Sequence, residues 1–306
     1  MTRKATIAGI LLAALIAWAA ISVVGDASPS HQAAAAQPFL ELGVAHPGEH
    51  YPPIGTEPIV FLVLGDSTGR TTEESRISDA IHLVGFNPGL NRASILNFPR
   101  DLWIPIPGHG TTKINAATEY GGADLMIQTI EDLTGIQIDY YAETGFSTFR
   151  TIVSDLGGVI VPVPYAIDDS HTGFNAPKGK LDMSGKVALQ FSRSRYGVPN
   201  GDFSRTENQG IFLTAMLSKL HKQFASNPNA VLDWIGAGLR STQNDIPLDQ
   251  LLALAFAAGQ IPPKNVNNTV VPGTVGNVGA ISVVELAPTA DKIFADFSKD
   301  GLIGKR

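Results

Sequence analysis

The run Ile59–Leu64 limits the possible fold more than any other segment of the chain. It consists of six consecutive apolar residues and ends at Gly65. A strand without polar residues has to be buried on both faces. Two further strand-like segments, Ile77–Phe86 and Ala93–Phe98, follow closely. The sequence therefore predicts a central sheet that is covered on both sides.

Later segments mix strand-like and helical patterns. Ala123–Leu133 has helical spacing and is followed by Gly135, a common residue after a helix end. Ser204 and Glu207 match a capping box, which predicts that a long helix begins after Ser204. The other expected elements are strands at Val159–Val163, Val187–Phe191 and Ile281–Leu286, and helices near Ala230–Arg240, Leu248–Gln260 and the C-terminus. Such a mixture favours an α/β layered sandwich.

The N-terminal sequence predicts export to the outer side of a membrane. Arg3 and Lys4 precede the uncharged run Ala5–Gly25, and about twenty apolar residues span a bilayer. The positive flank should remain cytoplasmic and place the rest of the chain outside. A cleaved signal peptide is the alternative, with a cleavage site near Ala33–Ala36.

The expected organisation has four parts. A cytoplasmic end and transmembrane anchor occupies residues 1–25, and a linker rich in Ala, Pro, Gly and Ser occupies residues 26–57. Residues 58–225 form the expected catalytic core, and residues 226–306 complete the same domain. The predicted location is the cell membrane, with one span and an extracytoplasmic catalytic domain.

Composition excludes several classes of protein. The formal net charge of −6 argues against general nucleic-acid binding, which needs a broad basic surface. The chain has no cysteine, so disulfides, thiolate nucleophiles and Cys-ligated metal sites are absent.

A short glycine-rich motif follows the first buried strand. Gly65-Asp66-Ser67-Thr68-Gly69 matches Gly-x-Ser-x-Gly, the nucleophile elbow of serine hydrolases. A strand-end turn explains the same residues, because Gly, Asp and Ser are common in turns. No Asp-x-x-His occurs near the C-terminus to supply a base. A serine esterase that uses Ser67 remains an alternative.

Charged residues gather where the expected strands end and the long helix begins. A surface ion pair would explain any one of these residues. Their occurrence together at element ends favours a ligand-binding site. Arg205 lies near a helix start, where backbone N–H groups attract anions, and Gln209 is on the same face. Arg193 and Arg195 are expected to alternate on a strand and to point to the same face. The set consists of Asp66, Arg70, Arg76, Asp79, Arg100, Asp101, Arg193, Arg195, Asp202 and Arg205.

These residue types favour a phosphate ligand. Planar guanidinium groups bind phosphate oxygens in pairs, and carboxylates beside them suggest a hard divalent cation such as Mg²⁺. Lys113, in Lys113-Ile114-Asn115-Ala116-Ala117, could add a point charge for phosphate. For this motif taken alone, a helix start followed by the loop pair Gly121-Gly122 is the better explanation.

These motifs, in this order, resemble the LytR–CpsA–Psr family of cell-wall glycopolymer transferases, and the segments Leu251–Ala258 and Val271–Gly273 resemble its actinobacterial members. The matching runs are Ser78-Asp79, Phe98-Pro99-Arg100-Asp101, Lys113–Ala117, Gly121-Gly122, Leu133–Ile136, Asp139–Tyr141, Leu156–Val159, Ala188-Leu189, Arg193-Ser194-Arg195, Gly201–Arg205 and Gln209.

The resemblance implies an α/β/α sandwich with a mixed central sheet, preceded by one transmembrane helix, and an apolar pocket for a polyprenyl tail. It implies an enzyme that moves a glycopolymer from a polyprenyl (pyro)phosphate carrier onto peptidoglycan with Mg²⁺. By resemblance, Asp66 and Asp79 are associated with the metal, and Arg100, Arg193, Arg195 and Arg205 bind pyrophosphate, with Asp202 and Gln209 in the same run.

The resemblance leaves some roles and reactions open. The spacing of Arg70 and Arg76 departs from the family pattern, so their roles are not carried over. Asp101 or Asp202 could orient the arginines or remove the acceptor proton. The same residues would also suit a pyrophosphatase that acts on these lipids, or a non-catalytic module that senses them.

Overall fold

A computed structural model describes residues 40–46, 57–66, 77–230, 232, 234–235, 242–244 and 246–304. The predicted anchor and most of the linker lie outside these ranges, as do Ser67, Arg70 and Arg76. Within the described ranges, no helix combines the length and apolar character needed to cross a membrane.

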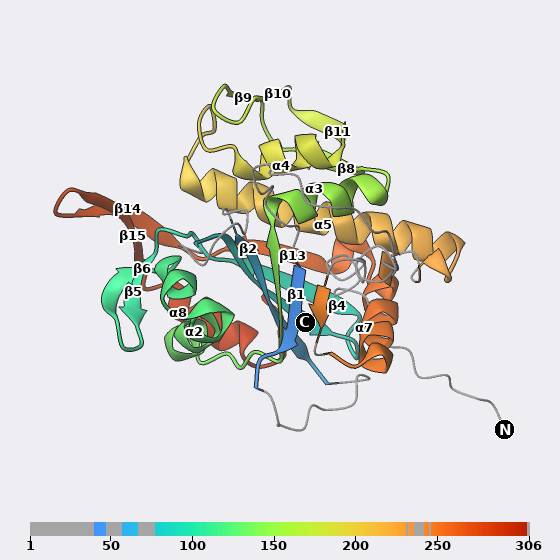
Figure 1. Ribbon diagram of the computed structural model, residues 1–306, viewed down its shortest axis with the longest axis horizontal. Helices are drawn as coiled ribbons and strands as arrows, with labels where there is room; N and C mark the ends of the chain where they lie inside the picture. Colours follow the sequence, from blue (N-terminus) through green and yellow to red (C-terminus); the bar gives the residue numbers. More distant parts are fainter. Residues whose placement is uncertain are drawn as a thin grey trace, which may run out of the picture.

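A mixed seven-stranded sheet forms the centre of the molecule (Figure 1). Its strand order is β12-β1-β7-β2-β3-β4-β13. The neighbours β7 and β2 run parallel, while β2, β3 and β4 are joined antiparallel. The strands are β12 (Thr242–Asn244), β1 (Leu40–Val44), β7 (Tyr140–Gly145), β2 (Ile59–Asp66), β3 (Ser78–Asn87), β4 (Arg92–Asn97) and β13 (Val266–Val270).

Both faces of this sheet are covered by helices, as the apolar run in β2 predicted. Alternate residues of β2 enter different cores: Phe61 packs beneath one helical layer, and Leu62 packs beneath the other. The first layer consists of α3 (Phe146–Asp155), α4 (Gly185–Arg193), α5 (Asp202–Ser226) and α7 (Leu248–Gln260), and the second consists of α2 (Ala116–Thr134) and α8 (Ala290–Phe297). The α/β fold with a mixed central sheet is confirmed.

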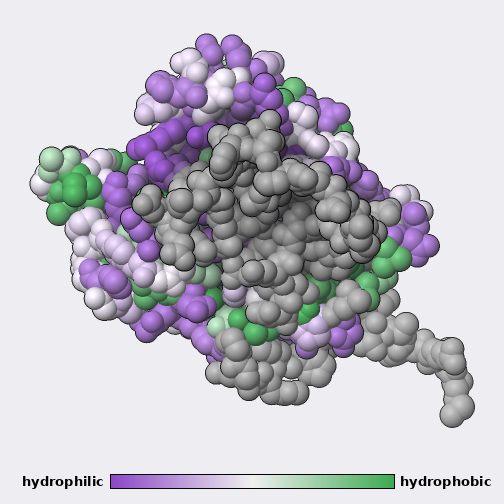
Figure 2. Space-filling model, in the orientation of Figure 1, coloured by the Kyte–Doolittle hydropathy of each residue, from purple (hydrophilic) through white to green (hydrophobic). Residues whose placement is uncertain are grey.

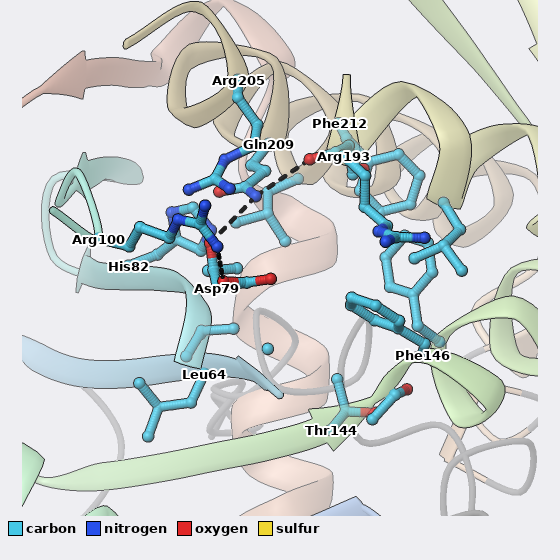
Figure 3. A pocket seen from close by; sticks show the side chains of 18 of the residues that line it. Leu64, Asp79, His82, Arg100, Thr144, Phe146, Arg193, Arg205, Gln209 and Phe212 are labelled. Atoms are coloured by element: carbon cyan, nitrogen blue, oxygen red, sulfur yellow. Dashed lines mark hydrogen bonds and ion pairs between the residues drawn. The ribbon is translucent and has the colours of Figure 1, made fainter. Parts of the chain in front are cut away.

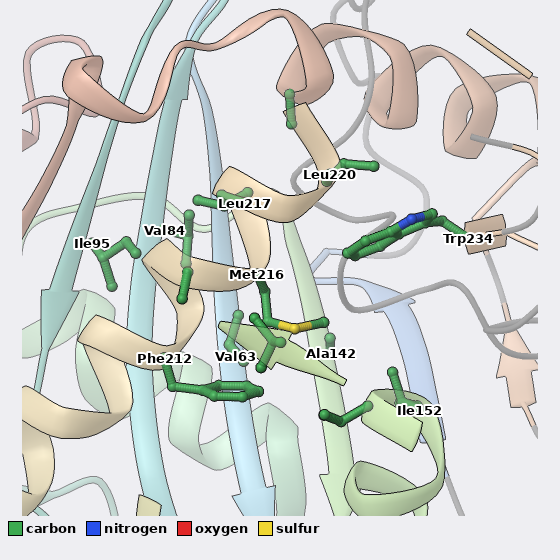
Figure 4. Close-up of a cluster of buried hydrophobic side chains, with 14 of the residues drawn as sticks. Val63, Val84, Ile95, Ala142, Ile152, Phe212, Met216, Leu217, Leu220 and Trp234 are labelled. Atoms are coloured by element: carbon green, nitrogen blue, oxygen red, sulfur yellow. The ribbon is translucent and has the colours of Figure 1, made fainter. Parts of the chain in front are cut away.

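Helix α5 packs along the middle of the sheet. Its apolar side presents Phe212, Met216 and Leu220 to the strands, where they meet residues such as Val63 and Val84 (Figure 4). Gly210 lies on the same side, and a Cβ there would stand 2.0 Å from Asn268 Oδ1. The helix can approach β13 this closely because position 210 has no side chain.

Smaller two-stranded sheets extend from the edges of the sandwich. One of them, the hairpin of β14 and β15, projects from the body of the molecule beside β5 and β6 (Figure 1). These strands are β5 (Trp103–Ile106), β6 (Gly110–Lys113), β8 (Val159–Val163), β11 (Gly179–Met183), β9 (Ile167–Asp169), β10 (Phe174–Ala176), β14 (Gly273–Val278) and β15 (Ile281–Leu286), and one short 3₁₀ turn, η1, spans Pro263–Asn265.

The C-terminal segment packs against the sheet. A Cβ on Gly85 of β3 would stand 1.9 Å from Gly301 O, so the two backbones meet where β3 has no side chain. Ile303 N donates to Ser94 Oγ at 2.9 Å, and Asn267 Nδ2 donates to Ile303 O at 3.0 Å. The C-terminal segment therefore contacts β3, β4 and β13 and stabilises their arrangement.

The predicted strand Val187–Phe191 is wrong, because these residues belong to helix α4. A short apolar run does not distinguish a strand from a buried helix by periodicity alone. Here Ala188 and Phe191, three residues apart, face the core as they do on a helix. Gly185 allows α4 to lie close to α3, since a Cβ there would stand 1.7 Å from Arg150 O.

The predicted capping box is also wrong. Helix α5 begins at Asp202, and its N-cap residue is Gly201, with φ at 51°. The hydroxyl of Ser204 instead accepts a hydrogen bond from the backbone N–H of Asn200 at 3.0 Å. Most of the predicted helix near Ala230–Arg240 lies outside the described residues, whereas the predicted helix Leu248–Gln260 is confirmed as α7.

Candidate active site

A cluster of paired charges lies where β3 and β4 meet the beginning of α5 (Figure 3). Arg100, just after β4, donates from Nη1 to Asp79 Oδ1 at the start of β3. Arg205 Nη2 lies 2.7 Å from Asp202 Oδ1, one turn apart on α5. Arg100 Nε is 3.9 Å from the same oxygen of Asp202. Three segments that are distant in the sequence thus contribute to one network.

A second set of ion pairs continues this network at its margin. Lys113 Nζ on β6 lies 2.8 Å from Asp101 Oδ1. Arg195 Nη2 is 3.8 Å from Asp101 Oδ2, and Arg195 Nε is 4.0 Å from Asp202 Oδ1. Lys113 does not line the cavity described below, so it acts on the site through Asp101.

Burial changes the electrostatics of the network. It raises the pKa of Asp202, although Arg205 beside it lowers that pKa. It lowers the pKa of Arg205, although Asp202 raises that pKa. For Arg100, burial opposes the charged form, yet Asp79 beside it holds the pKa above the ordinary value. The charges are held in a poorly hydrated environment, where each interacts more strongly than in water.

The arginines retain unused hydrogen-bonding capacity. The Nε atoms of Arg100 and Arg205 are buried and make no hydrogen bond within the described part of the chain. Buried donors normally have partners, so these atoms favour an anionic ligand with several acceptor oxygens. The Nε donor of Arg205 lies one turn inside α5, while Asp202 already complements the helix N-terminus.

Gln209 holds the elements of the site together. Its Nε2 donates to Ser192 O of α4 at 3.1 Å and lies 3.5 Å from Asp79 O. Its side chain is buried beside Arg205 on the same face of α5, as their spacing predicted. It therefore connects α5, α4 and β3.

His82 adds a buried neutral group that the sequence did not single out. Its Nδ1 lies 2.7 Å from Asn97 Oδ1, and Asn97 Nδ2 donates to Asn268 Oδ1 at 2.6 Å. Burial, together with the charge of Arg205, lowers the pKa of His82 to about 4, although the contact with Asn97 raises it. The sequence indicated this residue only as a histidine between apolar residues of the expected strand.

The charged cluster forms one end of a cavity of about 300 Å³. Among the described lining residues, four arginines (100, 193, 195 and 205) accompany one aspartate, Asp79. Away from this end the wall becomes apolar. It is then formed by Val63, Phe146, Phe149, Ile152, Val153, Leu189, Phe212, Leu213 and Met216. The cavity therefore suits a ligand with an anionic head and a hydrocarbon tail.

Arg193 and Arg195 do not share a strand face, so that part of the prediction is wrong. Arg193 ends α4, and its guanidinium lies 4.6 Å from the centroid of the Phe146 ring. Figure 3 shows it across the cavity from Arg100 and Arg205. Arg195 lies in the loop that follows the helix. The two guanidinium groups thus approach the cavity from different directions.

Asp169 positions the loop that carries Arg195. Its Oδ2 accepts the backbone N–H groups of Arg195 at 2.9 Å and Tyr196 at 3.0 Å. Its Oδ1 accepts the N–H groups of His171 and Thr172 at 2.9 and 3.2 Å. Burial opposes the charged form, but these bonds hold the pKa of Asp169 below its ordinary value. The sequence did not predict this residue because its partners are backbone groups.

The sequence assigned two aspartates, Asp66 and Asp79, to a metal ion. Asp66, fully buried at the end of β2, faces Ser78 across the irregular pairing with β3, and Asp79 follows Ser78. Asp66 does not line the cavity, whereas Asp79 does. No cluster of three or more His, Asp or Glu occurs among the residues described. Mg²⁺ is commonly held by one or two carboxylates together with substrate phosphates, and these two aspartates fit that arrangement.

Fold and cavity together define an α/β/α sandwich with a cavity that joins a cluster of arginines to an apolar wall. The LytR_cpsA_psr family model matches residues 27–297. The chain belongs to this family.

Named relatives and solved structures extend the comparison. The polyisoprenyl-teichoic acid–peptidoglycan teichoic acid transferase TagU of Bacillus cereus is 35% identical over 167 residues, which cover 54% of this chain and 53% of TagU. TagT of Bacillus subtilis, which bears the same activity in its name, is 33% identical over 198 residues, 61% of this chain and 60% of TagT. The chain thus spans between half and two-thirds of the length of these relatives.

The fold matches over a larger share. Bacillus subtilis TagV superposes with a TM-score of 0.67 at 24% identity, covering 79% of this chain and 95% of TagV. A structure of TagT bound to LIIa-WTA gives a TM-score of 0.63 at 25% identity, covering 81% of this chain and 91% of TagT.

Proposed function

We propose that this protein transfers a glycopolymer phosphate from a polyprenyl pyrophosphate carrier to a hydroxyl of peptidoglycan, which forms a phosphodiester link and releases polyprenyl phosphate. The observation that carries the proposal is a cavity that has arginines at one end and an apolar wall. The names of TagU and TagT describe this class of transfer, and TagT has been captured with LIIa-WTA.

The proposed chemistry depends on charge stabilisation. Arg100 and Arg205 would donate to the phosphate oxygens through guanidinium atoms that lack partners in the described part of the protein. Preorganised donors in a desolvated site stabilise the charge that develops as a phosphoryl group is transferred. The apolar wall would hold the polyprenyl tail and fix the position of the phosphate relative to these donors.

A base has to accept the proton of the acceptor hydroxyl. Asp202 suits this role because burial raises its pKa, the direction that a general base needs near neutral pH. Asp101, which pairs with Lys113 and lies near Arg195, is the second candidate.

Mg²⁺ is part of the proposal. Asp79 and Asp66 are the residues that would hold it, and when bound it would neutralise phosphate oxygens. Chelation should therefore lower the transfer rate, and added Mg²⁺ should restore it.

The proposed setting is the outer side of a membrane. The support is the apolar run Ala5–Gly25 after Arg3 and Lys4, which favours a retained single-pass anchor. The similarity of the segment after residue 250 to actinobacterial members supports that subtype in the same way.

The test uses the full-length protein in detergent with a lipid-linked glycopolymer, Mg²⁺ and nascent peptidoglycan. Products are identified by mass. Arg100→Ala and Arg195→Ala should each lower transfer by about 100-fold or more, as loss of a transition-state donor does, while thermal unfolding shows that the fold survives. Arg150→Ala, an exposed arginine on α3, is the matched control.

The same assay separates the competing reactions. Release of glycopolymer phosphate into water without attachment would identify a pyrophosphatase. Loss of activity in Ser67→Ala, with Arg100→Ala unaffected, would identify a serine esterase. Wild-type transfer rates in both arginine variants would contradict the proposed site.

A further inference from the structure

A second cavity lies on the other side of the charged cluster. Its volume is about 820 Å³, and it is bounded by the loop before α5, the start of α5 and the β14–β15 hairpin. Its lining includes Asn200, Gly201, Phe203, Val275 and Ser282. We propose that this groove binds the glycan strand of the acceptor, an inference that rests on the proposed transfer.

The two cavities adjoin each other at the charged cluster. Arg195 and Tyr196 line both of them, and Asp101 and Asp202 line the second. Displacement at phosphorus brings the attacking oxygen in line with the leaving oxygen, from the opposite side. A donor whose tail fills the first cavity therefore presents its phosphate towards the second, and the attacking hydroxyl has to arrive from there.

The lining of the groove fits a carbohydrate. Asp101 provides carboxylate oxygens that accept hydrogen bonds from sugar hydroxyls. The Tyr196 side chain is 54% exposed and is stacked on His171 with the ring centroids 4.0 Å apart. A stacked aromatic ring with one open side offers a flat apolar surface to the C–H face of a sugar ring. In the proposed transfer the attacking hydroxyl belongs to a sugar of the glycan strand, so the glycan part of peptidoglycan is the occupant of the groove.

The hairpin supplies the outer wall. Val275 pairs with Val284 and Asn277 pairs with Ser282, so Val275 and Ser282 lie on the same face of the two strands. Val275 is 69% exposed, and the projecting end of the hairpin carries a patch of hydrophobic surface (Figure 2). Thr274 is exposed and points to the opposite face. The hairpin therefore offers one face to the groove and one to solvent.

A pair of matched substitutions tests the assignment in the full-length protein. Ser282→Trp places a large side chain in the groove, and Thr274→Trp places the same side chain on the other face of the hairpin. Ser282→Trp should raise the KM for peptidoglycan glycan fragments by roughly tenfold or more, with kcat and donor affinity close to the parent's, since it removes acceptor binding only. Thr274→Trp should leave all three unchanged.

The outcomes separate this proposal from the proposed function. An unchanged acceptor KM in Ser282→Trp, or an equal loss in both variants, would overturn the groove assignment. If the parent protein transfers nothing, the proposed function fails, and binding of purified muramyl glycan fragments to the parent and to Ser282→Trp decides the groove by itself. Equal fragment affinity in the two proteins would then reject it.

Discussion

The charged residues of the site stabilise one another only as a set. Asp202 and Arg205 are both almost fully buried, and their contact at 2.7 Å compensates the desolvation of each. Removing one member of a buried pair leaves the other charge uncompensated, which costs more than the pair contributes.

A double-mutant cycle checks this dependence. Arg205→Met should lower the free energy of unfolding by about 3–5 kcal/mol, because Asp202 then remains buried without its close partner. Asp202→Asn combined with Arg205→Met should recover most of that loss while remaining inactive. Chemical denaturation of the parent, both single variants and the double variant measures the coupling, and additive effects would contradict it.

Asp139, outside the site, makes stability depend on pH. Its Oδ2 accepts the backbone N–H of Val60 at 2.7 Å, and burial raises its pKa from 3.8 to about 6. The folded state therefore binds this proton more tightly than the unfolded state. The contribution of Asp139 is most favourable below about pH 4 and is lost as the pH rises through about 6.

Asp139→Asn should remove this dependence. The variant should be more stable than the parent at pH 7.5, by at most about 3 kcal/mol, because no charge has to be buried. The difference should shrink towards zero near pH 4. Unfolding free energies of both proteins at several pH values give the test, and a difference that is constant with pH would contradict it.

Individual site residues were predictable from the sequence where charged side chains occur at the ends of expected strands and helices. Arginines beside aspartates at element ends identified Arg100, Arg195 and Arg205. Asp169 was not predictable, because it acts by accepting backbone N–H groups that only the folded loop brings together. His82 looked like one polar residue in an apolar strand.

At the level of elements, helix α4 shows what periodicity cannot resolve. Val187–Phe191 is short and apolar, which fits either a strand or a buried helix. Packing against α3 favours the helix, because Gly185 has no side chain and lets the backbone of α4 contact the backbone of α3. The strands β2, β3 and β4 were predictable within one or two residues because long apolar segments between turns leave few other arrangements.

Helix α4 also offers a way to test the apolar wall. Leu189 lines the cavity, whereas Lys186 on the same helix is exposed. Leu189→Trp should weaken binding of polyprenyl pyrophosphate by roughly tenfold, because the larger ring occupies space needed by the tail, while inorganic pyrophosphate binds as before. Lys186→Trp is the control. Equal affinities of the parent and Leu189→Trp for the lipid would show that the tail lies elsewhere.

At the scale of the whole molecule, the anion site should couple to stability. A ligand that binds only the folded state raises its stability in proportion to the logarithm of its concentration. Pyrophosphate should therefore raise the melting temperature of the protein, and the effect should weaken with added salt, which screens partly exposed arginines. The Arg100→Ala variant should respond less. An equal shift in parent and variant would indicate binding outside the cluster.

The contact between Gly85 and Gly301 has a consequence for how the protein is made. A ribosome releases β2, β3 and β4 long before residue 301, yet the sheet that supports the site is completed only when β13 pairs with β4 and the C-terminal segment settles over β3. Asn268 of β13 also contacts Asn97, which in turn contacts His82 beside the arginines. A chain whose synthesis has not yet reached β13 and residue 301 therefore lacks the segments that complete the support of the arginine cluster.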